Sequence, residues 1–227
     1  MTLTGLHGGL VVSIQPVAGS ALEAPHIVAA LARCAIANGA AGVRIEGLAR
    51  IAAVREAVGG GAPIVGILKR AVSGYEPYIT PTLADVEAVL AAGATIVAAD
   101  ATARARPDGS TFDDAVRAIR SRGALAMADC ATLEEAQRAA AAGAEIVATT
   151  LCGYTPATKG TPLPALDLVR AMKKKGLAFT ICEGGVGSPE EVDEAFEAGA
   201  DAVVVGTALT DIDGHIRRFA QAARRAS

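Results

Sequence analysis

Short apolar runs alternate with longer stretches of helical periodicity along the whole chain. The apolar runs are continuous rather than alternating, which is typical of strands buried on both faces of a parallel sheet. The pattern predicts eight strands, at residues 10–14, 41–45, 63–69, 94–100, 124–129, 145–150, 177–183 and 201–206. It predicts eight helices, at residues 25–38, 48–58, 83–92, 112–122, 133–142, 166–175, 189–198 and 212–225.

A repeat supports this alternation. Four segments share an alanine-rich helix end, a glycine suited to ending a helix, and a β-branched run; their glycines are Gly39, Gly93, Gly143 and Gly199. The spacing is about twice the length of one strand–helix unit, so each interval has room for one further strand. Residues suited to capping helices also stand at the expected positions, namely Thr82, Thr111, Thr132 and Ser188. We therefore predict an α/β fold, a closed (β/α)8 TIM barrel, as a single domain over residues 1–227.

The predicted strands mostly begin with small or apolar residues and end in polar or ionisable ones. In such barrels the active site lies at the C-terminal ends of the strands. The strand-end residues are Gln15, Arg44, Glu46, Lys69, Asp100, Asp129, Thr149, Thr150, Glu183 and Gly206. No histidine lies at a strand end and no nucleophile elbow is present, so the candidates for proton transfer are a lysine and three carboxylates. These are Lys69, Asp100, Asp129 and Glu183.

Each candidate also has a structural interpretation. Lys69 and Glu183 each follow a strongly apolar strand, which favours a functional role over simple surface exposure. Asp100 and Asp129 fit equally well as helix caps or as partners of a nearby arginine. Arg44 requires a counter-ion or an anionic substrate, and Glu46 is a candidate partner for it.

Glycine-rich turns follow the last two predicted strands, at residues 183–191 and 204–210. Many barrels bind phosphate at this place through backbone N–H groups. The predicted phosphate-binding residues are Gly184, Gly185, Gly206 and Thr207.

Composition narrows the class of protein further. The net charge of −3 provides no basic surface for nucleic acid or an anionic membrane. The first residues do not resemble a signal peptide. The four cysteines form no CxxC pair and no metal-ligand spacing, and are expected to be free thiols; they are Cys34, Cys130, Cys152 and Cys182. We expect a cytoplasmic protein without metal, nucleic-acid or membrane partners.

A family resemblance covers nearly the whole chain. The segments that carry it are VVSIQPV, GVRIEG, IVGILKR, ITPTLADV, DATARARP, MADCATLEEA, TTLCGYTP and EGGVGSPEEV. Together they resemble the N-acetylmannosamine-6-phosphate 2-epimerases of amino-sugar and sialic acid catabolism. The resemblance implies a (β/α)8-barrel isomerase that needs no cofactor. Such an enzyme interconverts N-acetylmannosamine 6-phosphate and N-acetylglucosamine 6-phosphate by deprotonating and reprotonating C2.

The resemblance also implies roles for individual residues. It places the catalytic lysine and glutamate at Lys69 and Glu183, and substrate contacts at Gln15, Arg44 and Asp129. Thr150 and Tyr154, in or beside the TTLCGYTP segment, complete the predicted substrate-binding set. In the open-chain sugar the C1 aldehyde acidifies the C2 proton, and two groups on opposite faces of C2 would invert that centre. Which group removes the proton in each direction stays open.

Two positions depart from the family pattern, and they leave open whether the substrate carries a 6-phosphate. The family usually has arginine where Gly185 stands, and a Thr-Arg pair where this chain has Thr210 and Asp211. The candidates to supply the missing charge are Arg44, Arg70 and Arg217. The alternatives are an epimerase, isomerase or lyase acting on a related sugar, with or without a phosphate, and a non-catalytic sugar-binding barrel. The reaction direction in the cell also stays open, and a homodimer is expected only as the commonest oligomer.

Overall fold

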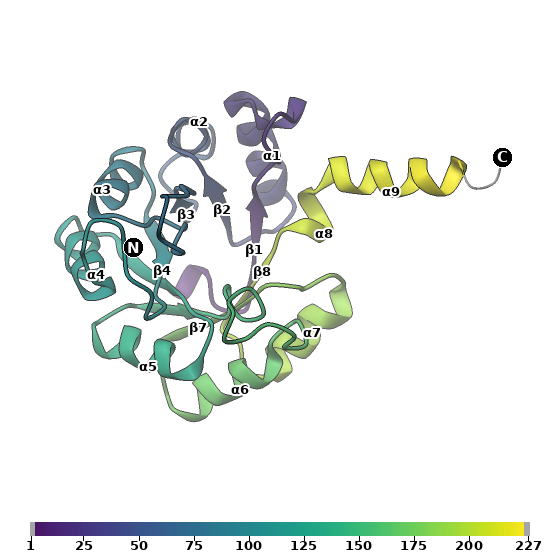
Figure 1. The fold of residues 1–227 in the computed structure, drawn as a ribbon. Helices are drawn as coiled ribbons and strands as arrows, with labels where there is room; N and C mark the ends of the chain where they lie inside the picture. Colours follow the sequence, from purple (N-terminus) through teal and green to yellow (C-terminus); the bar gives the residue numbers. More distant parts are fainter. Residues whose placement is uncertain (1–2, 225–227) are drawn as a thin grey trace.

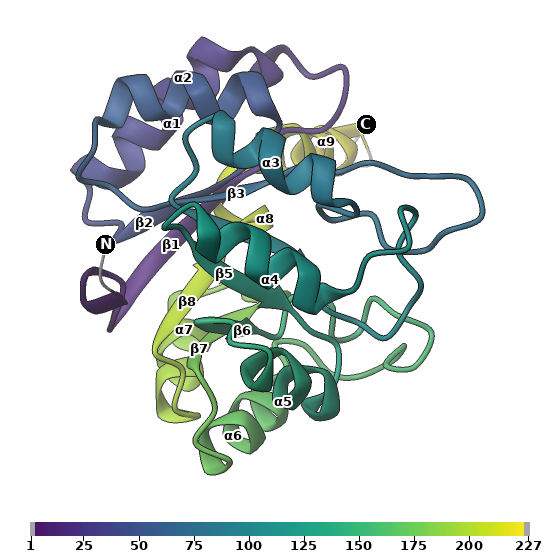
Figure 2. The same ribbon diagram turned by 90° about the vertical axis from the view of Figure 1, so that its left-hand side faces the viewer.

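Parallel strands of the computed structural model, which describes residues 3–224, close into one barrel in sequence order (Figures 1 and 2). The barrel closes where β1 pairs with β8 as well as with β2. The strands are β1 Gly9–Ile14, β2 Gly42–Glu46, β3 Ile64–Ile67, β4 Ile96–Asp100, β5 Leu125–Asp129, β6 Ile146–Ala148, β7 Phe179–Glu183 and β8 Ala202–Val205. The predicted (β/α)8 barrel is confirmed, and all eight predicted strands occur.

Helices surround this barrel. They are α1 Pro25–Ala37, α2 Leu48–Val58, α3 Leu83–Ala91, α4 Phe112–Ser121, α5 Leu133–Ala141, α6 Leu166–Lys174, α7 Pro189–Glu197, α8 Thr207–Thr210 and α9 Ile212–Arg224. Within the described residues, each predicted helix occurs to within one residue of its bounds; residue 225, the predicted end of the last helix, lies outside them. The short helix α8 and two 3-10 turns, Leu3–Gly5 and Ala21–Glu23, were not predicted.

Local sequence signals explain the helix boundaries. The predicted N-caps are confirmed, because Thr82, Thr111, Thr132 and Ser188 each accept a hydrogen bond from a backbone N–H in the first turn. A cap of this kind stabilises a helix by about 1 kcal/mol. The four repeat glycines all have φ between 95° and 100°. That conformation explains why glycine recurs at the point where helix turns into strand.

Apolar side chains fill both the barrel and the layer between strands and helices. The interior holds small and branched residues such as Val65, Ile96 and Ile146, and a second cluster packs the strands against the helices. Arg44 is an exception, since this charged side chain is 1% exposed inside the C-terminal half of the barrel. A buried charge requires partners, and these define the site described below.

The C-terminal helix departs from the ring of helices. In Figure 1, α8 lies at the end of β8, and α9 extends outward from the barrel. No residue of α9 is buried, and Ile216 and Phe219 are 62% and 78% exposed. The start of this segment is tied to the barrel, because the Thr210 hydroxyl donates to the backbone oxygen of Ser13 at 2.8 Å.

Candidate active site

A cavity of about 720 Å³ opens at the C-terminal ends of the strands. Of the residues predicted to be catalytic, substrate-binding or phosphate-binding, all but Asp129 line it, namely Gln15, Arg44, Lys69, Thr150, Tyr154, Glu183, Gly184, Gly185, Gly206 and Thr207. Their strands meet at one rim because parallel strands of a barrel all end at the same face. Among the other strand-end candidates, Glu46, Asp100 and Thr149 are not lining residues.

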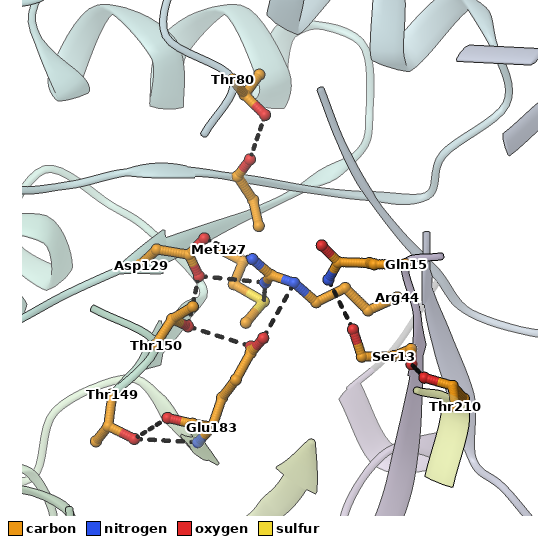
Figure 3. A network of polar contacts seen from close by, with 11 residues as sticks. Ser13, Gln15, Arg44, Thr80, Met127, Asp129, Thr149, Thr150, Glu183 and Thr210 are labelled. Atoms are coloured by element: carbon orange, nitrogen blue, oxygen red, sulfur yellow. Dashed lines mark hydrogen bonds and ion pairs between the residues drawn. The ribbon is translucent and has the colours of Figure 1, made fainter. Parts of the chain in front are cut away.

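The floor of the cavity is a buried charge network (Figure 3). The Arg44 guanidinium binds Asp129 through two hydrogen bonds, of 3.2 Å and 2.7 Å, and its Nε lies 3.2 Å from Glu183 Oε1. Burial acts to lower the pKa of Arg44, but the two carboxylates outweigh it and the pKa is raised. The alternative pairing of Arg44 with Glu46 is wrong, because Glu46 forms its ion pair with Arg50 at the start of α2.

Asp129 supports this floor from behind. It is fully buried, and it contacts both Arg44 and the Thr150 hydroxyl, which lies 2.7 Å from its Oδ1. A direct contact with substrate stays a prediction, whereas its observed contacts orient two residues that line the cavity. Asp100 is the partner of a nearby arginine, one of the two structural roles considered for it. Its carboxylate lies 2.6 Å from Arg104 and accepts a hydrogen bond from the Thr102 hydroxyl at 2.6 Å.

Glu183 is held in a state suited to proton transfer. Burial raises its pKa, Arg44 lowers it and Asp129 raises it again, giving a pKa of about 7. The Thr150 hydroxyl lies 2.7 Å from Asp129 and 3.1 Å from Glu183 Oε2. One hydroxyl has one proton, so when Thr150 donates to Asp129 its oxygen can accept a hydrogen bond from protonated Glu183. Glu183 can therefore hold or release a proton near neutral pH.

Lys69 lies at the cavity mouth, just beyond β3. A single antiparallel bridge to Ile79 fixes the backbone there. Partial burial lowers the pKa of Lys69, and the positive charge of Arg44 lowers it further. A lysine with a lowered pKa has a larger neutral fraction and is a better general base.

The loop after β3 supplies two lining residues that sequence reasoning missed, Tyr78 and Ile79. Arg106 anchors this loop by donating to the backbone oxygen of Thr80 at 2.7 Å, and the Thr80 hydroxyl donates to Ala98 at 2.7 Å. Arg106 belongs to the DATARARP segment, which therefore acts as a brace for the cavity wall. The available signal was the position of Tyr78, in a loop at the C-terminal face.

Gln15 lines the cavity and has an unsatisfied acceptor atom. Its Nε2 donates to the Ser13 hydroxyl at 2.7 Å, which orients the amide. Its Oε1 is buried and has no hydrogen-bond partner among the described residues. A buried acceptor of this kind favours a ligand that brings an N–H or O–H group.

One glycine of the turn after β7, Gly185, has no room for a larger residue. Gly185 has φ 79°, and a Cβ there would lie 2.4 Å from the Cβ of Leu163. An arginine at this position is therefore incompatible with the observed packing.

None of the three arginines predicted to replace the missing phosphate-binding arginines is both unpaired and at the cavity. Arg44 lines the cavity but is engaged by two carboxylates. Arg70 pairs with Asp85 at 2.8 Å, and Arg217 is not among the residues lining the cavity. Arg218, which was not predicted, does line it.

All four cysteines are free, as predicted. Within residues 3–224, no group of three or more His, Cys, Asp or Glu side chains is arranged to hold a metal ion. No helix in the same range is long and apolar enough to cross a membrane.

The fold and the cavity at the C-terminal ends of the strands together define an enzyme of the (β/α)8-barrel class. A family model described as "Putative N-acetylmannosamine-6-phosphate epimerase" matches residues 28–225, and the chain belongs to this family, NanE. A "Putative N-acetylmannosamine-6-phosphate 2-epimerase" of Thermosynechococcus vestitus is 45% identical over 96% of this chain and 95% of its own length. The "Bifunctional enzyme NanE/NanK" of Brucella melitensis is 45% identical over 98% of this chain and 42% of its own length.

A solved structure agrees with this assignment. The N-acetylmannosamine-6-phosphate 2-epimerase from Clostridium perfringens superimposes with a TM-score of 0.91 at 37% identity, covering 96% of this chain and 95% of that one. The family resemblance predicted from the sequence motifs is thus confirmed.

Proposed function

We propose that this protein interconverts N-acetylmannosamine 6-phosphate and N-acetylglucosamine 6-phosphate by proton exchange at C2. The observation that carries this proposal is the pairing of Lys69 and Glu183 in one cavity. The pKa of the lysine is lowered and that of the glutamate is raised, so the two approach neutrality from opposite sides. Such a pair suits a reaction in which one site both removes and returns a proton.

The chemistry follows from these groups. Once the sugar ring is open, one group takes the C2 proton, and the electron pair moves toward the C1 carbonyl oxygen to form an enolate. A proton delivered to the opposite face of C2 re-forms the aldehyde with inverted configuration. Lys69 and Glu183 are the proposed donor and acceptor, with their roles exchanged between the two directions.

The remaining lining residues recognise the sugar in this proposal. The sugar is contacted by Gln15 Oε1, the Arg44 guanidinium, Thr150 and Tyr154. Asp129 acts indirectly, by orienting Arg44 and Thr150. The backbone at Gly184, Gly185, Gly206 and Thr207 faces the phosphate.

Incubation in D2O tests the proposed function. The protein is supplied with N-acetylmannosamine 6-phosphate and, in parallel, with N-acetylmannosamine, and C2 is followed by NMR. Inversion with deuterium appearing at C2 is the expected result for the phosphorylated sugar. Inversion without deuterium at C2, or no conversion of the 6-phosphate, would contradict the proposal. Faster turnover of the unphosphorylated sugar would favour the alternative substrate class.

Asp211→Asn is expected to lower KM for the 6-phosphate severalfold without loss of stability. Asp211 lines the cavity while its carboxylate accepts the Gly214 N–H at 2.9 Å at the start of α9. Asparagine can keep that capping bond and removes a negative charge that opposes an anionic substrate. Steady-state kinetics and thermal unfolding measure the two effects. An unchanged KM at low ionic strength would show that this carboxylate does not influence substrate binding.

We also propose a cytoplasmic homodimer, with α9 in its interface. The exposed apolar side chains of Ile216 and Phe219 on a projecting helix support it, because such groups usually become covered on association. Phe219→Asp is expected to shift the mass measured by light scattering from dimer to monomer. A parent protein that is monomeric at micromolar concentration would contradict the dimer.

A further inference from the structure

One wall of the cavity is not used by the proton-transfer chemistry. It is formed by α8 and the first turns of α9, and its charged or titratable residues are Asp211, Asp213, His215 and Arg218. The other cations lining the cavity have assigned partners or roles, since Arg44 is engaged by Asp129 and Glu183 and Lys69 lies at the proton-transfer site. Arg218 is therefore the permanent positive charge left for an anionic ligand among the described lining residues.

One hydrogen bond, to His215, orients the exposed Arg218 side chain. His215 Nε2 lies 3.1 Å from the backbone oxygen of Thr207, and a carbonyl can only accept, so this nitrogen carries the proton. Nδ1 of the neutral ring is then an acceptor, and Arg218 Nη2 lies 2.6 Å from it. The imidazole thus links the guanidinium to the backbone of α8. Arg218 spends one N–H on this bond and forms no other hydrogen bond within residues 3–224, which leaves further donors of its planar group available.

The two acidic residues of this wall do not neutralise Arg218. Asp211 accepts the Gly214 N–H at 2.9 Å, and Asp213 accepts the Ser20 hydroxyl at 2.7 Å. In the described part of the chain, neither carboxylate forms an ion pair with Arg218. The guanidinium therefore keeps its full charge for a ligand, although both carboxylates reduce the local positive potential.

We propose that Arg218, positioned by His215, binds the phosphate group of the substrate. The inference rests on the proposed function for the presence of that phosphate. It explains how this chain can hold a phosphate with Gly185 and Asp211 at the two positions where the sequence departs from the family's arginines. A guanidinium is well suited to the task, because its parallel N–H groups match two phosphate oxygens at once. Arg218 contacts the ligand directly, and His215 acts through Arg218.

Arg218→Met tests the proposal against a matched control, Arg217→Met, which removes the same charge one residue away from the cavity lining. Arg218→Met is expected to raise KM for N-acetylglucosamine 6-phosphate roughly 10- to 100-fold, as for loss of a charge-assisted hydrogen bond, with little change in kcat. Competitive inhibition by inorganic phosphate should weaken by a similar factor. Arg217→Met should leave both values unchanged. Light scattering checks that both variants keep the parent's oligomeric state.

The outcomes separate this proposal from the proposed function. Equal phosphate affinity in Arg218→Met and Arg217→Met overturns it, whatever the activity. If the parent lacks epimerase activity, calorimetric titration with inorganic phosphate still decides: binding lost only in Arg218→Met supports the site, and no binding by the parent overturns it.

His215 has a separate test, because its role is positional. His215→Ala should raise KM for the phosphorylated sugar with kcat retained, and His215→Gln, which keeps a donor and an acceptor, should recover part of the loss. In the double variant with Arg218→Met, removing His215 should add little further, since both changes disrupt the same contact. Fully additive losses would show that His215 acts independently of Arg218 and would overturn this part of the proposal.

Discussion

Lys69→Met is expected to lower kcat at least ~100-fold while KM changes far less. Methionine keeps the length and apolar stem of the side chain but cannot exchange a proton. The lowered pKa of Lys69 supplies neutral amine as the base in the parent. Substrate binding depends mainly on other groups, so the loss should fall on the chemical step.

Lys159→Met provides the control for this experiment. Lys159 is exposed and does not line the cavity, so kcat should be unchanged in that variant. Near-normal turnover by Lys69→Met would remove Lys69 from the mechanism. Deuterium incorporation at C2 without inversion would instead indicate that Glu183 still exchanges the proton on one face.

Glu183→Gln is expected to lower kcat at least ~100-fold and, at the same time, to stabilise the protein above neutral pH. The pKa of Glu183 is about 7 in the folded protein, above the ordinary value of 4.5, chiefly because the group is buried. Such a group stabilises the fold fully below about pH 4.5, and this contribution is lost as pH rises through 7. Glutamine removes the penalty for the buried charge, and its amide oxygen can occupy the place of Glu183 Oε1, which lies 3.2 Å from Arg44 Nε.

Thermal unfolding at pH 5 and pH 8 measures this second effect. The variant should match the parent at the lower pH and exceed it at the higher pH by roughly 1–3 kcal/mol, a few degrees in Tm. Glu194→Gln, on the exposed face of α7, should show no such pH dependence. Greater destabilisation at pH 8 than at pH 5 would mean that the ionised carboxylate strengthens the network. Retained turnover by Glu183→Gln would assign both proton transfers to Lys69.

The strands and the residues at their ends were accessible from the sequence for a physical reason. Strands buried on both faces require continuous apolar runs, and the first polar residue after such a run marks the rim. Barrel closure then brings Gln15, Lys69 and Glu183 to one cavity, although they are far apart in the chain. The sequence pattern was therefore enough to predict a site residue wherever its position depends only on the strand that carries it.

The residues that were missed depend on contacts between distant segments. Tyr78 is placed by a loop that Arg106 anchors, and Arg218 by a histidine bonded to the preceding helix. Neither contact produces a periodic pattern of apolar and polar residues in the sequence. The partner of Arg44 was misjudged for a related reason. Glu46 is its neighbour two residues along β2, but Arg50 approaches Glu46 from α2 while Asp129 reaches Arg44 from β5.

The contact between Gly185 and Leu163 makes these two positions epistatic. Arginine at 185 would collide with the Leu163 side chain, and it would also have to adopt the left-handed conformation that glycine tolerates. A single substitution to arginine at this position is therefore incompatible with the observed packing and requires a change at Leu163 as well. While Leu163 is in place, a gain in anion affinity has to come from another position on the rim of the cavity. The same constraint applies to engineering, where an arginine introduced at 185 has to be combined with a smaller residue at 163.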